Sequence, residues 1–189
     1  MRSCHSAAPA GSPLASTAAY VWLTRRSFHS HPLQRAECAS ARPRYGCVVM
    51  ELPATGQVPV VRADYSSDLV WEELQEEIVS PTEEGFQANV EFVEDRSLEG
   101  LDERAIAAAI PRRYPSGYRH AVMFVVDAAA VSSPDHPLLV VSLHERHPSA
   151  PFRAVPRAVQ AIENNLSIAN MDFHEFASAV DPGGVFRGF

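Results

Sequence analysis

The hydrophobic pattern of residues 50–189 predicts strands and helices that alternate along the chain. Runs of β-branched or alternating apolar residues predict strands at residues 58–62, 88–94, 121–126, 138–143 and 152–155. Apolar positions at helical spacing predict helices at residues 66–79, 101–110, 156–164 and 172–180. Strands that alternate with helices first and then follow one another indicate an α/β fold. We expect a single compact domain, with a mixed sheet of about four to five strands flanked by helices.

The charge of the chain changes sign near Met50. Six arginines and one acid give residues 1–49 a formal charge of +5, so the chain's total of −7 leaves −12 on residues 50–189. The three cysteines, Cys4, Cys38 and Cys47, all lie in the first segment, so we expect no disulfide and no cysteine metal ligand in the second. The chain therefore divides into an N-terminal segment, 1–49, and an α/β domain, 50–189.

The N-terminal segment is rich in Ala, Ser, Pro, Arg and His, which predicts disorder. Arg25 and Arg26 resemble a twin-arginine export motif, but the apolar stretch that such a signal needs does not follow them. The composition is also compatible with an organellar transit peptide. We favour the interpretation that Met50 is the true start and that the segment is a translated leader or a gene-model artefact. We expect the domain to be cytoplasmic.

The common sequence motifs of catalysis are absent from the chain. It has no P-loop, no dinucleotide-binding glycine motif, no His-Glu-x-x-His and no nucleophile elbow. Arg112, Arg113 and Arg119 form too small a basic cluster to indicate nucleic-acid binding in an acidic domain. No run approaches the roughly 20 apolar residues of a membrane span. We therefore expect no cofactor, no metal, no nucleic acid and no membrane partner.

The best candidate for catalysis is a group of acids and histidines after the two most apolar strands. Asp127 follows residues 121–126, and His144 and Glu145 follow residues 138–143. Open α/β sheets place ligands outside the carboxyl ends of their strands, where these groups would bind a divalent metal or act as a general base. Neighbouring members of the group are Asp135, His136 and His147. Such residues are also ordinary in exposed loops, so both interpretations stay open.

A second candidate is the acidic face of the first predicted helix. It carries two like-charge pairs four residues apart, formed by Glu72, Glu73, Glu76 and Glu77. Each such pair costs about 0.2–0.5 kcal/mol of helix stability. A cationic partner would relieve this repulsion, and a domain of negative charge would steer that partner toward it. The alternative is a solvated helix face without a partner.

A third candidate is a cluster of polar residues between the last two predicted helices, which we call the polar corner: Asn164, Asn165, Asn170 and Asp172. Asp172 and Glu175 fit a capping box, and asparagine tolerates the left-handed conformation at a helix end. A self-contained helix–turn–helix corner explains most of these residues, and a groove that presents amides to a ligand is the alternative. We expect Leu166 and Ile168 to enter the core, and Phe186 and Phe189 to fold over it.

The run from Glu163 to Phe189, ENNLSIANMDFHEFASAVDPGGVFRGF, resembles an uncharacterised bacterial family, domain of unknown function 6924. Residues 59–64 and 89–95 add to this resemblance, which covers about residues 50–189. It implies one domain that ends at the chain terminus, and it implies no activity.

For function, we rank a small acidic cytoplasmic protein-binding module first, of the inhibitor, immunity or regulatory kind, with a basic protein as its partner. The competing hypothesis is a hydrolase or metal-dependent enzyme that uses Asp127 and His144. Small size, negative charge and missing catalytic motifs favour the first.

Overall fold

The structure is a computed structural model, and it describes residues 51–111, 120–144 and 149–189. These residues belong to one unit of the chain, Gly46–Phe189. Glu145, His147 and the three arginines at 112, 113 and 119 lie outside the described residues, as does the whole of the N-terminal segment.

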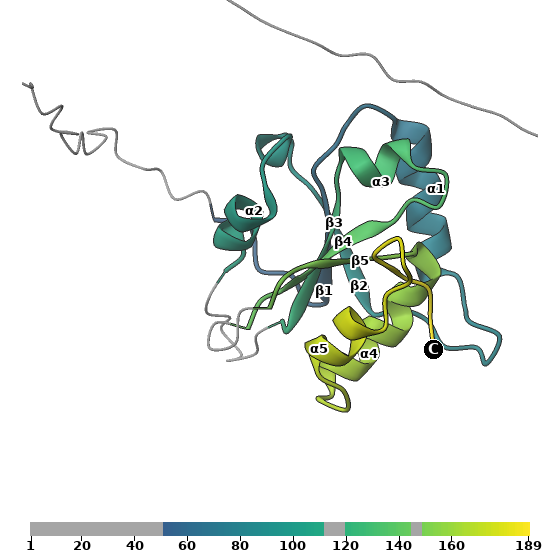
Figure 1. Ribbon diagram of the computed structural model, residues 1–189. Helices are drawn as coiled ribbons and strands as arrows, with labels where there is room; N and C mark the ends of the chain where they lie inside the picture. The colour runs from purple at the N-terminus through teal and green to yellow at the C-terminus, as the bar shows by residue number, and fades with distance from the viewer. Residues whose placement is uncertain (1–50, 112–119, 145–148) are drawn as a thin grey trace, which may run out of the picture. The chain divides into compact units, whose positions relative to one another are not determined.

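Helices flank a mixed six-stranded sheet (Figure 1). In chain order the elements are β1 (Val58–Arg62), α1 (Asp68–Val79), β2 (Val90–Glu94), the 3-10 turn η1 (Arg96–Leu98), α2 (Glu103–Ala109), β3 (Val122–Val126), α3 (Ala128–Ser132), β4 (Leu138–Ser142), β5 (Phe152–Ala154), η2 (Pro156–Ala158), α4 (Val159–Ser167), α5 (Phe173–Ser178) and β6 (Val185–Phe186). The strand order is β2-β1-β3-β4-β5-β6.

The sheet has a parallel part and a part in which strand direction changes. β1 pairs in parallel with β2 on one side and with β3 on the other. β4 is antiparallel to both β3 and β5, and β6 is parallel to β5. The carboxyl ends of β1, β2 and β3 therefore meet at one edge, which is where open α/β sheets place their ligands.

Side-chain caps fix where the helices begin. The hydroxyl of Ser67 accepts a hydrogen bond from the Val70 backbone N–H and starts α1, while Asp102 caps α2 and Asp127 caps α3 in the same way. Each such cap is worth about 1 kcal/mol, because it satisfies a backbone donor that the helix leaves unpaired. The cap at Ser67 sets α1 directly beside the carboxyl end of β1.

Two hydrophobic clusters cover the two faces of the sheet. On one face α1 and α4 pack through residues such as Trp71, Leu74 and Ile162 against the sheet. On the other face α2 packs through Ile106 and Ala109. Figure 1 shows α1 and α2 on opposite sides of the sheet, as the two clusters require. Alternate side chains of the central strands enter opposite clusters, which explains why β3 is apolar throughout.

The predicted α/β class, the mixed sheet and the flanking helices are confirmed. The sheet has six strands and not four to five. The additional strand, β6, was not predicted because it is only two residues long and shows no alternation of apolar and polar residues. α3 was not predicted either, since five residues are too few to show a helical period. Leu166 is buried as expected, but the prediction for Ile168 was wrong: it is 65% exposed, since it caps the end of α4.

Among the residues that the structure describes, no helix is long and apolar enough to cross a membrane.

Candidate functional site

A buried arginine stands at the carboxyl end of β1. The side chain of Arg62 is only 4% exposed, although it is the last residue of its strand. Its register partner on β2 is Glu94, also the last residue of its strand. Parallel pairing thus brings opposite charges side by side at the edge of the sheet.

The Arg62 guanidinium is held by two carboxylates and two backbone carbonyls. It donates to Glu94 Oε2 at 3.1 Å and to Asp68 Oδ1 at 2.5 Å, and also to the carbonyl oxygens of Asp64 and Ser67. Burial lowers the pKa of this guanidinium, but the hydrogen bonds to Asp68 and Glu94 outweigh burial and raise the pKa above its ordinary value. Arg62 is therefore a permanent cation with a fixed orientation.

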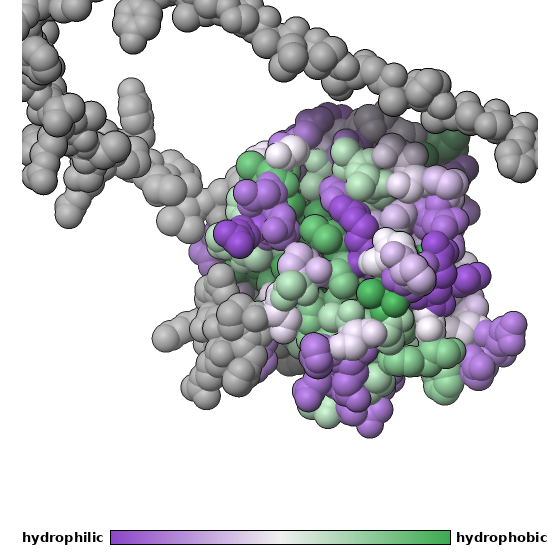
Figure 2. Space-filling model, viewed as in Figure 1, coloured by the Kyte–Doolittle hydropathy of each residue, from purple (hydrophilic) through white to green (hydrophobic). Residues whose placement is uncertain are grey.

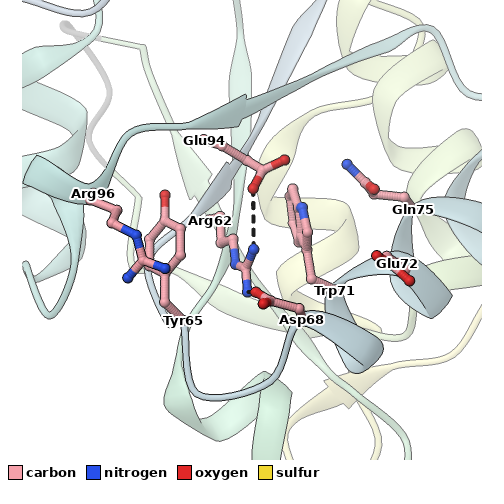
Figure 3. A pocket seen from close by; sticks show the side chains of 8 residues that line it. All are labelled: Arg62, Tyr65, Asp68, Trp71, Glu72, Gln75, Glu94 and Arg96. Carbon is pink, nitrogen blue, oxygen red and sulfur yellow. Dashed lines mark hydrogen bonds and ion pairs between the residues drawn. The ribbon is translucent and has the colours of Figure 1, made fainter.

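Aromatic rings enclose the same guanidinium. The Arg62 Cζ atom lies 4.3 Å from the ring centroid of Tyr65 and 5.4 Å from that of Trp71. Arg96 lies against Tyr65 as well, at 4.5 Å, and Figure 3 shows Tyr65 between the two arginines. Each cation over a ring contributes about 0.5–2 kcal/mol, the more so where water is excluded.

These side chains line a pocket of about 510 Å³ at the carboxyl ends of β1 and β2 (Figure 3). Its lining consists of Arg62, Tyr65, Asp68, Trp71, Glu72, Gln75, Glu94 and Arg96. Three carboxylates and two guanidiniums give the lining a formal charge of −1. The volume lies within the range of small-ligand sites, and the position is the one that α/β folds favour for binding.

Two polar atoms in the pocket wall have no hydrogen-bond partner among the described residues. They are the hydroxyl of Tyr65 and the indole nitrogen of Trp71, and both are buried. Burial raises the pKa of Tyr65, although the charges of Arg62 and Arg96 oppose the rise, so the hydroxyl keeps its proton. A buried polar group without a partner costs about 1–3 kcal/mol, so native structures hold few of them and each one calls for an explanation.

The acidic face predicted from the sequence lies beside this pocket. Glu72, Glu73, Glu76 and Glu77 are all exposed on α1, and within the described residues none of them has an ion-pair partner. Glu72 also lines the pocket. Figure 2 shows hydrophilic side chains gathered along the side of the molecule on which Figure 1 draws α1. The exposed glutamates and the pocket therefore form one negatively charged surface.

The structure does not bring Asp127 and His144 together. Asp127 follows β3 and His144 follows β4, and these strands are antiparallel, with Val122 opposite Ser142 and Val125 opposite Leu139. By this register His144 lies opposite position 120, seven residues from Asp127, so the two residues lie at opposite ends of the paired strands, roughly 24 Å apart at about 3.4 Å per residue. They cannot act on one substrate atom from these positions. Glu145, the third weak candidate, lies outside the described residues.

Asp127 has a structural role instead. It accepts a hydrogen bond from the Ala130 backbone N–H as the cap of α3, and it forms a two-point ion pair with Arg153 of β5, with N–O distances of 3.1 and 2.7 Å. Burial raises the pKa of Asp127, but the bonds from Arg153 and Ala130 hold the pKa below its ordinary value. Its oxygens are engaged, which disfavours metal binding there. No group of three or more potential metal ligands occurs in the described ranges.

The polar corner is largely satisfied by its own hydrogen bonds. The Asn165 amide donates to the Ala161 carbonyl at 2.8 Å, and the Asn170 amide donates to Asn165 Oδ1 at 2.7 Å. Asp172 caps α5 in the predicted capping box with Glu175. Asn164 is exposed. These contacts favour the structural interpretation of the corner, and a ligand there stays an untested prediction.

A buried histidine that no sequence pattern indicated joins two segments of the chain. His120 is 4% exposed, and its Nε2 lies 3.0 Å from Thr55 Oγ1 and 3.2 Å from the Thr55 carbonyl oxygen. Burial lowers the pKa of His120 below its ordinary value, against the opposing effects of the Thr55 carbonyl and the charge of Glu91. The neutral imidazole is therefore the form that the fold accommodates.

We predict a loss of stability in weak acid that depends on His120. Because its pKa is lower in the folded state than in the unfolded state, the unfolded chain binds the proton first. The free energy of unfolding should thus fall as the pH drops below about 6.5, and keep falling until the folded pKa is passed. Urea unfolding at several pH values should show this slope in the wild type and in His174→Gln, which alters an exposed histidine. An unchanged slope in His120→Gln would contradict the assignment.

Comparison with known proteins shows the family of the chain and gives no information on what the site binds or catalyses. No curated protein matches the chain. One family model does match, over residues 57–189, which includes every strand and helix described above. Its description is "Domain of unknown function (DUF6924)", in agreement with the resemblance of the C-terminal run, and the chain belongs to this family.

Proposed function

We propose that the domain is an acidic protein-binding module, and that α1 and the adjoining pocket form its docking surface. The observation that carries the proposal is the pocket at the ends of β1 and β2, whose wall holds two polar atoms, of Tyr65 and Trp71, that find no hydrogen-bond partner in the described part of the chain. The glutamates of α1 extend this pocket into a wider negative surface.

A basic protein is the partner that suits this surface best. The lining of the pocket is net negative, and the four glutamates of α1 repel one another until an opposite charge approaches. With −12 on residues 50–189, the long-range field also attracts cations and speeds their association. A cytoplasmic location belongs to the same proposal.

The experiment is affinity capture from a lysate of the source organism with matched charge variants. Glu73→Arg/Glu76→Arg reverses two exposed charges on α1 that lie outside the pocket. Glu51→Arg/Glu103→Arg makes the same change in net charge near α2, on the opposite face of the sheet. All three proteins should be compared at low and at high salt, with mass spectrometry of the eluates.

We expect the wild type and the α2-side control to retain the same basic protein, and high salt to release it. The α1 variant should lose that protein, or hold it at least about tenfold more weakly, since each exposed charge contact contributes up to about 1 kcal/mol and a reversal adds repulsion. Equal loss from both variants would show that only net charge matters and would refute a docking face on α1. Retention by all three would refute it too.

A further inference from the structure

The donors and acceptors of the pocket point to a particular kind of ligand. Trp71 is only 3% exposed, and its indole nitrogen can only donate a hydrogen bond. The Tyr65 hydroxyl both donates and accepts. A ligand that satisfies both atoms must offer an acceptor to Trp71 and either an acceptor or a donor to Tyr65. A simple anion offers acceptors to both atoms, whereas a simple cation leaves the Trp71 N–H without an acceptor.

Charge separates these alternatives further. The positive charge of Arg62 is already engaged by Asp68 and Glu94, so an incoming anion would compete with two carboxylates for it. Asp68 and Glu94 themselves face solvent, with side chains that are 76% and 48% exposed, and Glu72 has no ion pair within the described residues. The pocket therefore attracts a cationic group and disfavours a free anion.

We propose that the pocket binds one arginine of a basic partner, together with the peptide group next to it. The guanidinium lies among the carboxylates of Asp68, Glu72 and Glu94, and a backbone carbonyl of the same segment accepts the hydrogen bond of Trp71 Nε1. The exposed rim residues Glu94 and Arg96 shift to admit the segment. This assignment rests on the proposed function, and it names the group that the pocket recognises.

Arg96 shows why arginine is the residue that fits. Its guanidinium packs on the outer face of the Tyr65 ring at 4.5 Å, while its side chain is 70% exposed and pairs weakly with Glu99 at 3.6 Å. A planar guanidinium stacks on a ring and bonds a carboxylate through two N–H groups, which an ammonium cannot do. Arg96 thus shows that this pocket lining already accommodates one guanidinium, and its charge repels an incoming cation.

The indole N–H of Trp71 provides a direct readout. The chain has two tryptophans, so the indole signal in a proton–nitrogen NMR spectrum is assigned with Trp71→Phe. The full chain is titrated with N-acetyl-arginine amide, with the neutral analogue N-acetyl-citrulline amide, with N-acetyl-lysine amide and with sodium phosphate. We expect the arginine amide to shift the Trp71 signal downfield and to bind at least about fivefold more tightly than the other three, the gain expected for one well-placed charge contact.

Two variants and one control test the contacts. Glu72→Gln removes a lining carboxylate that holds no structural bond, and it should weaken the arginine amide about two- to fivefold. Glu103→Gln makes the same change on α2, outside both the pocket and the docking surface, and should leave the affinity unchanged. Arg96→Gln removes the competing cation and should strengthen binding by a similar factor.

Each contrary outcome overturns the assignment. A shift of the Trp71 signal by phosphate alone would make the pocket an anion site, and equal binding of citrulline or lysine amide would remove the specificity for arginine. If no probe shifts the signal while the basic partner is still captured through Glu73 and Glu76, the pocket assignment fails and the proposed function stands. If the arginine amide binds but no basic protein is captured, the pocket assignment stands and the proposed function fails.

Discussion

Replacing Phe186 by alanine should lower the free energy of unfolding by about 3–5 kcal/mol, although the residue lies three positions from the chain terminus. Its side chain is fully buried, and its ring contacts those of Phe152 and Phe176, with centroids 6.5 and 5.3 Å away. Truncation removes this packing and leaves a cavity between β5 and α5. Urea unfolding should show a lower midpoint with an unchanged slope.

Phe189→Ala is the matched control for this prediction. The Phe189 ring also meets Phe176 and Phe186, at 5.5 and 5.1 Å, but its side chain is 80% exposed. Its loss should cost less than about 1 kcal/mol, since little apolar area returns to water. Similar losses for the two variants would mean that the C-terminal run does not close the core as described.

Arg62→Met should lower the free energy of unfolding by about 2 kcal/mol. Removing one partner of a fully buried ion pair costs about 3–5 kcal/mol, because a buried charge is left behind. Here the remaining carboxylates of Asp68 and Glu94 face water, so the loss is limited to the hydrogen bonds and the stacking on Tyr65 and Trp71. Methionine keeps most of the aliphatic volume, so a large cavity does not add to the cost.

Glu94→Gln provides the contrast for Arg62→Met. Glutamine keeps an acceptor for the Arg62 N–H and loses only the charge of a half-exposed carboxylate, so the cost should stay below about 1 kcal/mol. Chemical denaturation of both variants, side by side with the wild type, measures the difference. A cost of Glu94→Gln that equals or exceeds that of Arg62→Met would show that the ion pair, and not the enclosed guanidinium, holds this edge of the sheet.

Local sequence patterns were sufficient to predict most elements of the fold. Apolar runs marked β1, β3 and β4, helical spacing marked α1, and Asp172 with Glu175 marked the start of α5, because each of these signals is contained within a few residues. The extra strand β6 lacks such a signal. It forms because Phe186 is buried against α5 and not because a two-residue segment favours a strand.

The candidate site depended on information that no local pattern contains. Asp127 and His144 were expected at the same end of the sheet because both follow apolar strands. They lie at opposite ends because β4 is antiparallel to β3, and no local sequence pattern indicates that direction. The pairing of Arg62 with Glu94 depends in the same way on the register between β1 and β2. An arginine at the end of an apolar strand, followed by Tyr65 and Trp71, was the available signal, and only the structure joins it to Glu94.

The most direct test of the docking surface uses the partner captured in the experiment above. Its dissociation constant should be measured by calorimetry at about 50 mM and about 300 mM salt, for the wild type and for Glu73→Arg/Glu76→Arg. We predict that salt weakens the wild-type complex at least about tenfold and weakens the variant complex far less, because the charges that salt screens are those of α1. An equal salt dependence in both proteins would place the contact elsewhere and would contradict the account.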